Sequence, residues 1–236
     1  MNEVFEPYNL ILLSMYFIKT PRFFKFLFLE GIWKIDNEAK KIFLTFDDGP
    51  VPEVTQFVLD TLNEYDVKAT FFCVGENAEK HPALLKRIKQ EGHAVGSHTY
   101  NHLNGWYTDN TEYFLNVRKA AKIVGSDLFR PPYGKLKPSQ VSFIRKHYQI
   151  IMWDVLSGDF DPKLSTEEIY ENIVTNVESG SIIVMHDSIK SEEKLKVVLP
   201  QILRFLLDSG YEFETLASIS KIKPQIHANI GQLVTI

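Results

Sequence analysis

Residues 41–50 read KIFLTFDDGP, a β-branched and aromatic run followed by two acids, a glycine and a proline. The run predicts a buried strand over residues 41–46, and Gly49-Pro50 predicts the turn that ends it. Residues 52–65 then place apolar side chains at mostly helical spacing, so a helix follows the strand. From Lys41 onward the sequence therefore begins to alternate strand and helix.

The alternation continues to about residue 215. Further strands are predicted at residues 68–74, 93–97, 149–153, 181–185 and 211–215, with a short apolar run at 128–130. Further helices are predicted at residues 77–90, 111–124, 166–178 and 195–208. Alternating strands and helices without repeats or long linkers indicate one α/β domain on a parallel sheet. We predict a distorted or incomplete (β/α) barrel with about seven parallel strands, and a doubly wound open sheet is the alternative.

Composition and charge limit the class of partner. The 236 residues are 44% apolar and 13% aromatic, enough for a packed core. The formal net charge is -4 and the pI is near 6.0. An acidic chain repels a polyanion, so no nucleic acid is expected as a partner. The single cysteine, Cys73, excludes an internal disulfide and lies in an apolar run, so it is predicted to be core packing.

The N-terminal residues 1–40 are expected to form an extension packed on the core. Residues 10–18 and 23–29 are apolar runs with basic residues between or within them, and neither reaches the roughly 20 residues that span a bilayer. The acidic opening lacks the pattern of a secretory signal, so we expect a cytoplasmic protein or one peripheral at the membrane. Membrane contact through residues 10–29 is the alternative to packing. Packing is favoured because it buries the aromatic side chains of these runs.

Charged or titratable side chains follow the predicted strands at the point where each strand ends. They are Asp47 and Asp48, His98 and His102, Asp154 and Asp159, and His186 and Asp187, while the turn at 131–134 follows the short run at 128–130. In parallel β/α folds the carboxyl ends of the strands share one face, where ligands bind. We therefore expect these side chains to meet in one site, with Asp154 and Asp187 left without an assigned role.

Two histidines and an acid pair predict a metal site. His98 and His102 are four residues apart, so on a helical turn their rings would project from the same face. Two imidazoles and one carboxylate suit a catalytic divalent ion with positions left open for water and substrate. Of the adjacent Asp47 and Asp48, one would bind the metal and the other would accept a proton from the attacking water. An Asx-type turn that caps the next helix is the alternative for this acid pair.

Four segments together resemble a known family. They read TFDDGP at 45–50, SHTYNH at 97–102, RPPYG at 130–134 and IVMHD at 183–187. In this order they are similar to the motifs of the polysaccharide deacetylases, also called carbohydrate esterase family four or the NodB-like domain. The resemblance covers about residues 41–215. It implies a catalytic domain at residues 41–220, a tail at 221–236, and a hydrolase that removes N-acetyl groups from amino sugars.

The resemblance also implies a metal centre and a base. It assigns Asp48, His98 and His102 as ligands of one divalent ion, with zinc as the first candidate and cobalt or manganese as alternatives. Asp47 is implied to be the general base, and Arg130 is implied to orient it. The residue pattern alone leaves open which of the two aspartates has which role.

Further roles are implied on the other side of the site. Tyr133 is implied to donate its backbone N–H to the oxyanion, and His186 to be the general acid, held by Asp159. The fourth motif departs from the family pattern, because Phe160 stands where tryptophan is usual. Phenylalanine keeps an aromatic wall but removes an indole N–H donor, which leaves the sugar preference open.

Three functions are compatible with this pattern. The favoured one is removal of N-acetyl groups from a carbohydrate substrate with N-acetylated amino sugars, such as peptidoglycan or a chitin-like chain. The alternatives are a deacylase or deformylase of a lipid-linked amino sugar and a carbohydrate-binding relic without turnover. The base, the acid and the metal ligands together argue against a relic, because binding alone needs no proton transfer.

Overall fold

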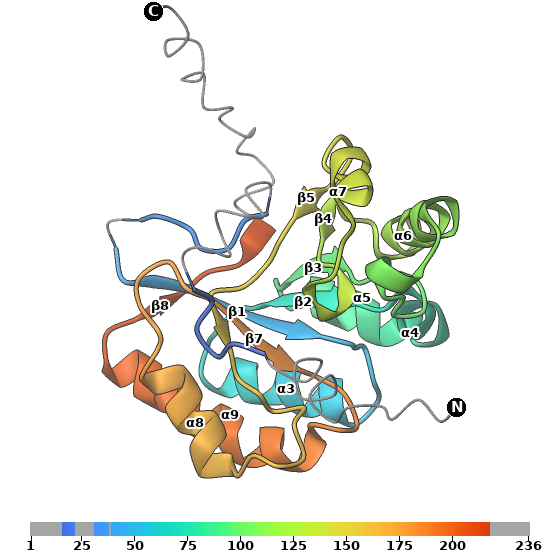
Figure 1. Cartoon of the computed structure of the whole chain (residues 1–236). Coiled ribbons are helices and arrows are strands. Elements are labelled where there is room, and N and C mark those ends of the chain that lie inside the picture. Colours follow the sequence, from blue (N-terminus) through green and yellow to red (C-terminus); the bar gives the residue numbers. More distant parts are fainter. Residues whose placement is uncertain (1–15, 22–30, 38, 218–236) are drawn as a thin grey trace, which may run out of the picture.

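The stretch that starts the alternation forms strand β1 (Lys41–Asp47), which is buried from Ile42 to Asp47. The computed structural model describes residues 16–21, 31–37 and 39–217 (Figure 1). The other strands are β2 (Thr70–Cys73), β3 (Ala94–Ser97), β4 (Leu128–Phe129), β5 (Gln149–Ile150), β6 (Val155–Leu156), β7 (Ile182–His186) and β8 (Glu212–Phe213). The helices are α3 (Val54–Glu64), α4 (Gly75–Lys80), α5 (Pro82–Gln90), α6 (Asn110–Val124), α7 (Pro138–Ile144), α8 (Thr166–Val174) and α9 (Glu192–Asp208), with short 3-10 turns η1 (Gly105–Tyr107) and η2 (Pro132–Gly134).

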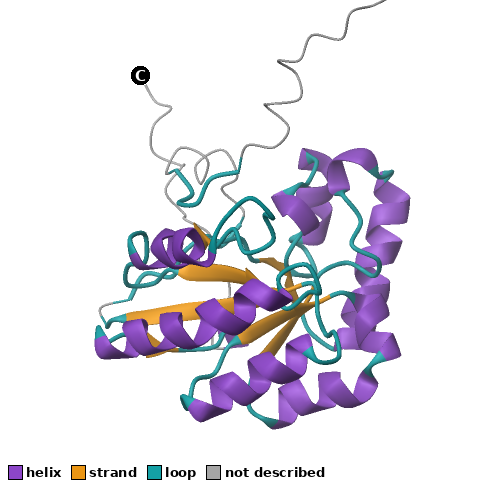
Figure 2. Cartoon of the chain, turned by 90° about the horizontal axis from the view of Figure 1, so that it is seen from below, coloured by secondary structure: helices purple, strands orange, loops and turns teal. Residues whose placement is uncertain are grey.

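The strand order forces the sheet to curl. The order is β5-β4-β3-β2-β1-β7-β6, with β8 paired to β1 outside this path, and the strand pairs are parallel. β5 and β6 follow each other in the chain yet occupy opposite ends of this order. The steps from Ile150 to Val155 reach at most about 18 Å, whereas the edges of a flat seven-stranded sheet would lie about 29 Å apart. The strands therefore form a half-barrel with helices outside it (Figure 2), which confirms the predicted distorted (β/α) barrel.

Parts of the N-terminal extension pair with the chain that connects β5 to β6. Ile32 donates its N–H to the carbonyl oxygen of Ile150 and accepts the N–H of Met152, both at 2.8 Å. Residues 16–20 lie beside β6, as described below. The remainder of the segment considered for membrane contact, residues 10–15 and 22–29, falls outside the described residues, so its packing stays a prediction.

One predicted helix is divided in the structure, and one predicted strand is shorter than expected. The helix predicted at residues 77–90 is α4 followed by α5, because Pro82 starts a new helix and disfavours helical geometry at His81. The strand predicted at residues 149–153 ends at Ile150, and the chain then crosses to β6. Helix α7 is not predicted by the sequence pattern, since about two turns give too little apolar periodicity to detect.

The central strands pack against the helices through a buried apolar core. One buried apolar cluster joins β1, β2 and β7 to helices α3, α5, α8 and α9. Cys73 lies in this cluster and is 1% exposed, which confirms that it is core packing. Among the described residues, no helix combines the length and apolar character needed to cross a bilayer.

Candidate active site

The predicted side chains lie where parallel strands end. In the register of β1 against β7, Asp47 is paired with His186, so these residues lie side by side on neighbouring strands. His98 directly follows β3 and Arg130 directly follows β4, which is paired with β3 at its last residue. Asp159 follows β6, the strand on the other side of β7. Parallel alignment thus brings residues from distant parts of the sequence to one edge of the sheet.

Asp48, His98 and His102 form a compact set of potential metal ligands. One ligand atom from each lies within 4.8 Å of the others. Asp48 Oδ1 is 3.2 Å from His102 Nε2 and 3.8 Å from His98 Nε2. Burial opposes ionisation of Asp48, but the facing imidazoles, His102 foremost, outweigh it and hold the pKa of this carboxyl below its ordinary value.

The donor atoms of this set fit a divalent cation. Asp48 Oδ1 is buried and has no hydrogen-bond partner among the described residues. His98 Nδ1 lies 2.8 Å from the carbonyl oxygen of Arg130, which can only accept, so Nδ1 carries the proton and Nε2 keeps its lone pair. Burial lowers the pKa of His98 to about 4, so the ring is neutral at pH 7. A carboxylate and neutral imidazoles are the ligands that a catalytic zinc site uses.

The loops that carry these ligands have unusual backbone geometry. Asp48, Thr99 and His102 have φ angles of 82°, 60° and 59°, a region that non-glycine residues rarely adopt. The prediction that His98 and His102 share a helical turn is wrong, because β3 ends at Ser97 and an irregular loop follows. Thr99 stabilises that loop by accepting the N–H of Leu103 at 3.0 Å. The two rings still approach to 5.0 Å between centroids.

Arg130 holds Asp47 in a buried ion pair. Its Nη1 lies 2.7 Å from Asp47 Oδ1, and the guanidinium is 0% exposed. The same group donates to Thr45 Oγ1 at 2.7 Å and to the carbonyl oxygen of Met152 at 3.0 Å. It also lies over the ring of Phe72, 4.0 Å from the centroid. These contacts fix the guanidinium, and through it the carboxylate of Asp47.

Both carboxylate oxygens of Asp159 bond to His186. Asp159 Oδ1 lies 2.7 Å from His186 Nδ1, and Oδ2 accepts the backbone N–H of His186 at 2.8 Å. The expected contact between these residues is therefore present. Burial alone would lower the pKa of His186, but the charge and hydrogen bond of Asp159 raise it to about 9. The ring is thus a cation at neutral pH and can donate a proton.

Two aromatic side chains border the metal ligands and the acid. Tyr133 is 60% exposed, has a φ of 60°, and its ring lies 4.8 Å from that of His102. Phe160 places its ring 5.1 Å from His186 in an edge-on contact. The residue at the position of the usual tryptophan therefore contacts the acid through its ring alone.

Asp187 has a structural role that the sequence leaves unassigned. It accepts the N–H of Gly49 at 3.0 Å and the hydroxyl of Thr55 at 2.6 Å, and burial raises its pKa to about 8. A Cβ on Gly49 would lie 1.9 Å from Asp187 Oδ2, so only glycine fits there. Asp187 thus fastens the turn that follows Asp48 to the end of β7. Its place directly after His186 is the sequence signal for this role.

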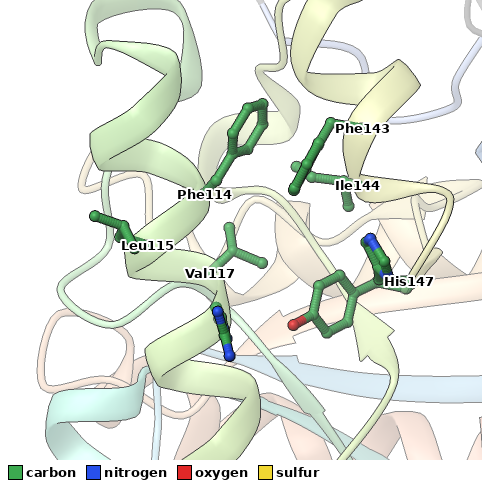
Figure 3. A pocket seen from close by; sticks show the side chains of 8 residues that line it. Phe114, Leu115, Val117, Phe143, Ile144 and His147 are labelled. Carbon is green, nitrogen blue, oxygen red and sulfur yellow. The ribbon is translucent and has the colours of Figure 1, made fainter.

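A cavity elsewhere on the molecule is separate from this site. It measures about 430 Å³, lies between α6 and α7, and has an apolar lining that includes Phe114, Val117, Phe143 and Ile144 (Figure 3). None of the predicted site residues lines it. The predicted site residues therefore lie in the strand-end cluster and not in this cavity.

Known proteins are similar to this chain in both sequence and fold. The family model described as polysaccharide deacetylase matches residues 34–149. Over 195 residues the chain is 36% identical to a peptidoglycan-N-acetylglucosamine deacetylase of Bacillus cereus, an alignment that covers 78% of this chain and 69% of the relative. The chain belongs to the polysaccharide deacetylase family.

Two further polysaccharide deacetylases extend this comparison. A chitooligosaccharide deacetylase of Azorhizobium caulinodans is 32% identical over 83% of this chain and 92% of its own length. A crystal structure of a peptidoglycan N-acetylglucosamine deacetylase superposes with a TM-score of 0.77 at 33% identity, covering 83% of this chain and 95% of that one. As a polysaccharide deacetylase, the protein is a hydrolase of carbon–nitrogen bonds other than peptide bonds. Its Asp48, His98 and His102 match the divalent metal site of these enzymes.

Proposed function

We propose that this polysaccharide deacetylase removes the N-acetyl group from amino sugars in peptidoglycan or chito-oligosaccharide chains. The relatives from B. cereus and A. caulinodans carry these two substrates in their names. One observation carries the proposal: Asp47 and His186 lie side by side on β1 and β7, next to the metal-ligand set. Hydrolysis of an amide needs both a proton acceptor and a proton donor, and this pair supplies both.

The first half of the reaction is attack of water on the acetyl carbonyl carbon. Asp48, His98 and His102 would hold the divalent ion, for which we propose zinc, and when bound it would supply the positive charge that acidifies water and polarises a carbonyl. Asp47 accepts the proton of the attacking water while Arg130 keeps its carboxylate in place. The backbone N–H of Tyr133 is assigned to the oxyanion that forms as the carbonyl bond opens.

The second half is cleavage of the bond between the carbonyl carbon and the sugar nitrogen. An amine leaves poorly unless its nitrogen gains a proton, and the charged ring of His186 can donate one. Asp159 keeps that ring in one orientation through Nδ1. The products are acetate and the free amino sugar. The proton gained by Asp47 balances the proton lost by His186 over one cycle.

Identification of the released acid tests the substrate. Zinc-loaded protein is incubated separately with chito-oligosaccharides, peptidoglycan and a lipid-linked amino sugar, and the acid is measured by chromatography. We expect acetate from one or both polysaccharides and none from the lipid-linked sugar. Release only from the lipid-linked sugar would replace this substrate class, and no acid from any of the three would favour a relic without turnover.

Matched variants of the two adjacent acids test the assigned roles. We expect Asp47→Asn to keep its affinity for zinc and to lose about 10²- to 10⁴-fold in kcat, since it removes only the proton acceptor. Asp48→Ala should lose zinc affinity as well, because it removes a ligand. Calorimetric titration of zinc into both variants measures this difference. Equal loss of zinc binding in the two proteins would show that the roles are assigned wrongly.

A further inference from the structure

We propose that residues 16–20 form part of the active site and that Tyr16 is a positioning residue for His186. The inference rests on the function proposed above, because it places Tyr16 at the same site. Residues 16–20 precede the part of the chain that matches the family model, which starts at residue 34. Backbone hydrogen bonds that fix residues 18–20 along β6 carry the inference, together with contacts from Tyr16 to Phe160 and from Phe160 to His186.

Residues 18–20 lie antiparallel to β6 and are fixed to it by backbone hydrogen bonds. Leu156 donates its N–H to the carbonyl oxygen of Ile18 at 2.8 Å, and Thr20 donates its N–H to that of Asp154 at 3.0 Å. β6 is an end of the strand order, so this segment adds a short edge to the half-barrel. Because the two segments are antiparallel, Tyr16, two residues before Ile18, lies toward the carboxyl end of β6, where the site lies.

Tyr16 contacts two consecutive residues of the loop that follows β6. Its hydroxyl donates to Asp161 Oδ2 at 2.7 Å, and its ring centroid lies 5.1 Å from that of Phe160. Burial, and then the Asp161 carboxylate, raise the pKa of Tyr16 above its ordinary value, so the phenol keeps its proton and remains a donor. These two contacts restrict the loop through both a ring and a hydrogen bond.

The same loop holds His186. Asp159 bonds to His186 Nδ1 at 2.7 Å, and Phe160 meets the imidazole at 5.1 Å between centroids. Tyr16 therefore touches the two residues that directly follow Asp159, and one of them packs on the acid itself. A misplacement of about 1 Å at a reacting group can cost about 10²-fold in rate. Movement of this loop would change the direction in which His186 offers its proton.

Graded substitutions at Tyr16 separate positioning from simple anchoring. Tyr16→Phe keeps the ring and loses only the hydrogen bond to Asp161, whereas Tyr16→Leu leaves a smaller apolar side chain and loses both contacts. Asp161→Ala removes the same hydrogen bond without changing residues 16–20, and it also removes the bond that Asp161 Oδ1 accepts from the N–H of Lys163, so Tyr16→Phe is the cleaner of the two. Tyr211→Phe is the matched control, since its hydroxyl bonds to the carbonyl oxygen of Val177 away from the site.

The measurements are kcat and KM on a chito-oligosaccharide, and the NMR resonances of the His186 ring protons in the metal-free protein. We expect kcat to fall about threefold in Tyr16→Phe and Asp161→Ala and about tenfold in Tyr16→Leu. KM should stay within about threefold in each, because Tyr16 acts on the acid and not on substrate binding. The His186 ring signals should shift in Tyr16→Leu, since the ring current of Phe160 moves, and stay in place in Tyr211→Phe.

The NMR signals keep this test independent of turnover. If the wild-type protein released no acetate, the proposed function would fail, yet the His186 signals would still show whether Tyr16 positions the ring. Unchanged kcat in Tyr16→Leu together with unmoved His186 signals would overturn the inference. A rise in KM alone would overturn it too, because it would make Tyr16 a substrate contact. Should Tyr16→Leu not fold, Tyr16→Phe and Asp161→Ala decide by the same criteria.

Discussion

At the scale of single residues, one backbone turn gives two adjacent acids different partners. Asp47 is the last residue of β1 and bonds to the buried Arg130. Asp48, with a φ of 82°, instead faces His102. Asn77 supports this turn by donating its side-chain N–H to the carbonyl oxygen of Asp48 at 2.8 Å. The strained angle thus separates the proposed base from the metal ligand within two positions of sequence.

The raised pKa of His186 leads to a prediction about how stability and kcat depend on pH. Because Asp159 raises that pKa to about 9 from an ordinary 6.5, the charged ring stabilises the folded chain fully below pH 6.5, and this contribution is lost as pH rises through about 9. We expect NMR titration of the metal-free protein to show a raised His186 pKa, and Asp159→Asn to lower it toward 6.5. In the zinc-loaded enzyme the alkaline loss of kcat should then move to lower pH. An unchanged titration midpoint in Asp159→Asn would contradict this account.

At the scale of elements, local pattern predicts some segments and misses others for identifiable reasons. Strand β1 and helix α6 are predicted to within one residue, because a buried strand and an amphipathic helix each leave a long apolar pattern. β6 has only two residues and exists through its pairing with β7, which no local pattern encodes. The residues of the site could be predicted because they follow strand ends. The loop between His98 and His102 could not, since Thr99 has a φ of 60° and its carbonyl oxygen accepts the N–H of Gly75, a residue distant in the sequence, at 2.9 Å.

The contact between Asp187, at the end of β7, and Gly49, in the turn before α3, leads to a prediction at this scale. Gly49→Ala would place a Cβ 1.9 Å from the buried Asp187 carboxyl, so either that carboxyl or the turn must shift, and the turn that carries Asp48 loses this support. Loss of such support typically costs about 10- to 100-fold in metal affinity. We expect zinc affinity, measured by calorimetric titration, to fall within this range.

A second glycine provides the control for that prediction. Gly210 has a φ of 76° and open space where a Cβ would be, so Gly210→Ala adds backbone strain away from the site. We expect it to lower the unfolding temperature while zinc affinity stays the same. Wild-type zinc affinity in Gly49→Ala would show that the contact with Asp187 does not position Asp48.

At the scale of the whole molecule, the described part of the N-terminal extension covers an edge of the half-barrel. The sheet order leaves β6 at one end, and residues 18–20 lie along it. An unpaired edge strand exposes backbone donors and acceptors, so covering it protects the fold. Lys19 adds a charged anchor, because its Nζ lies 2.6 Å from Oδ2 of the fully buried Asp154. The extension is therefore joined to the sheet by backbone hydrogen bonds and by the ion pair between Lys19 and the buried Asp154.

Substitution of Lys19 tests how much this anchor contributes to stability. Lys19→Met would leave the Asp154 carboxylate its bond from Ser181 but remove the ammonium, which also contacts the carbonyl oxygen of Asn176 at 2.7 Å. Because Lys19 is partly exposed and Asp154 is not, we expect the free energy of unfolding in urea to fall by about 1–3 kcal/mol. Lys196→Met is the matched control, since that lysine pairs with Glu192 one turn away on an exposed helix face and should change stability by less than about 0.5 kcal/mol. Equal changes in the two variants would mean that the Lys19 ammonium adds no stability beyond the other contacts of residues 16–20.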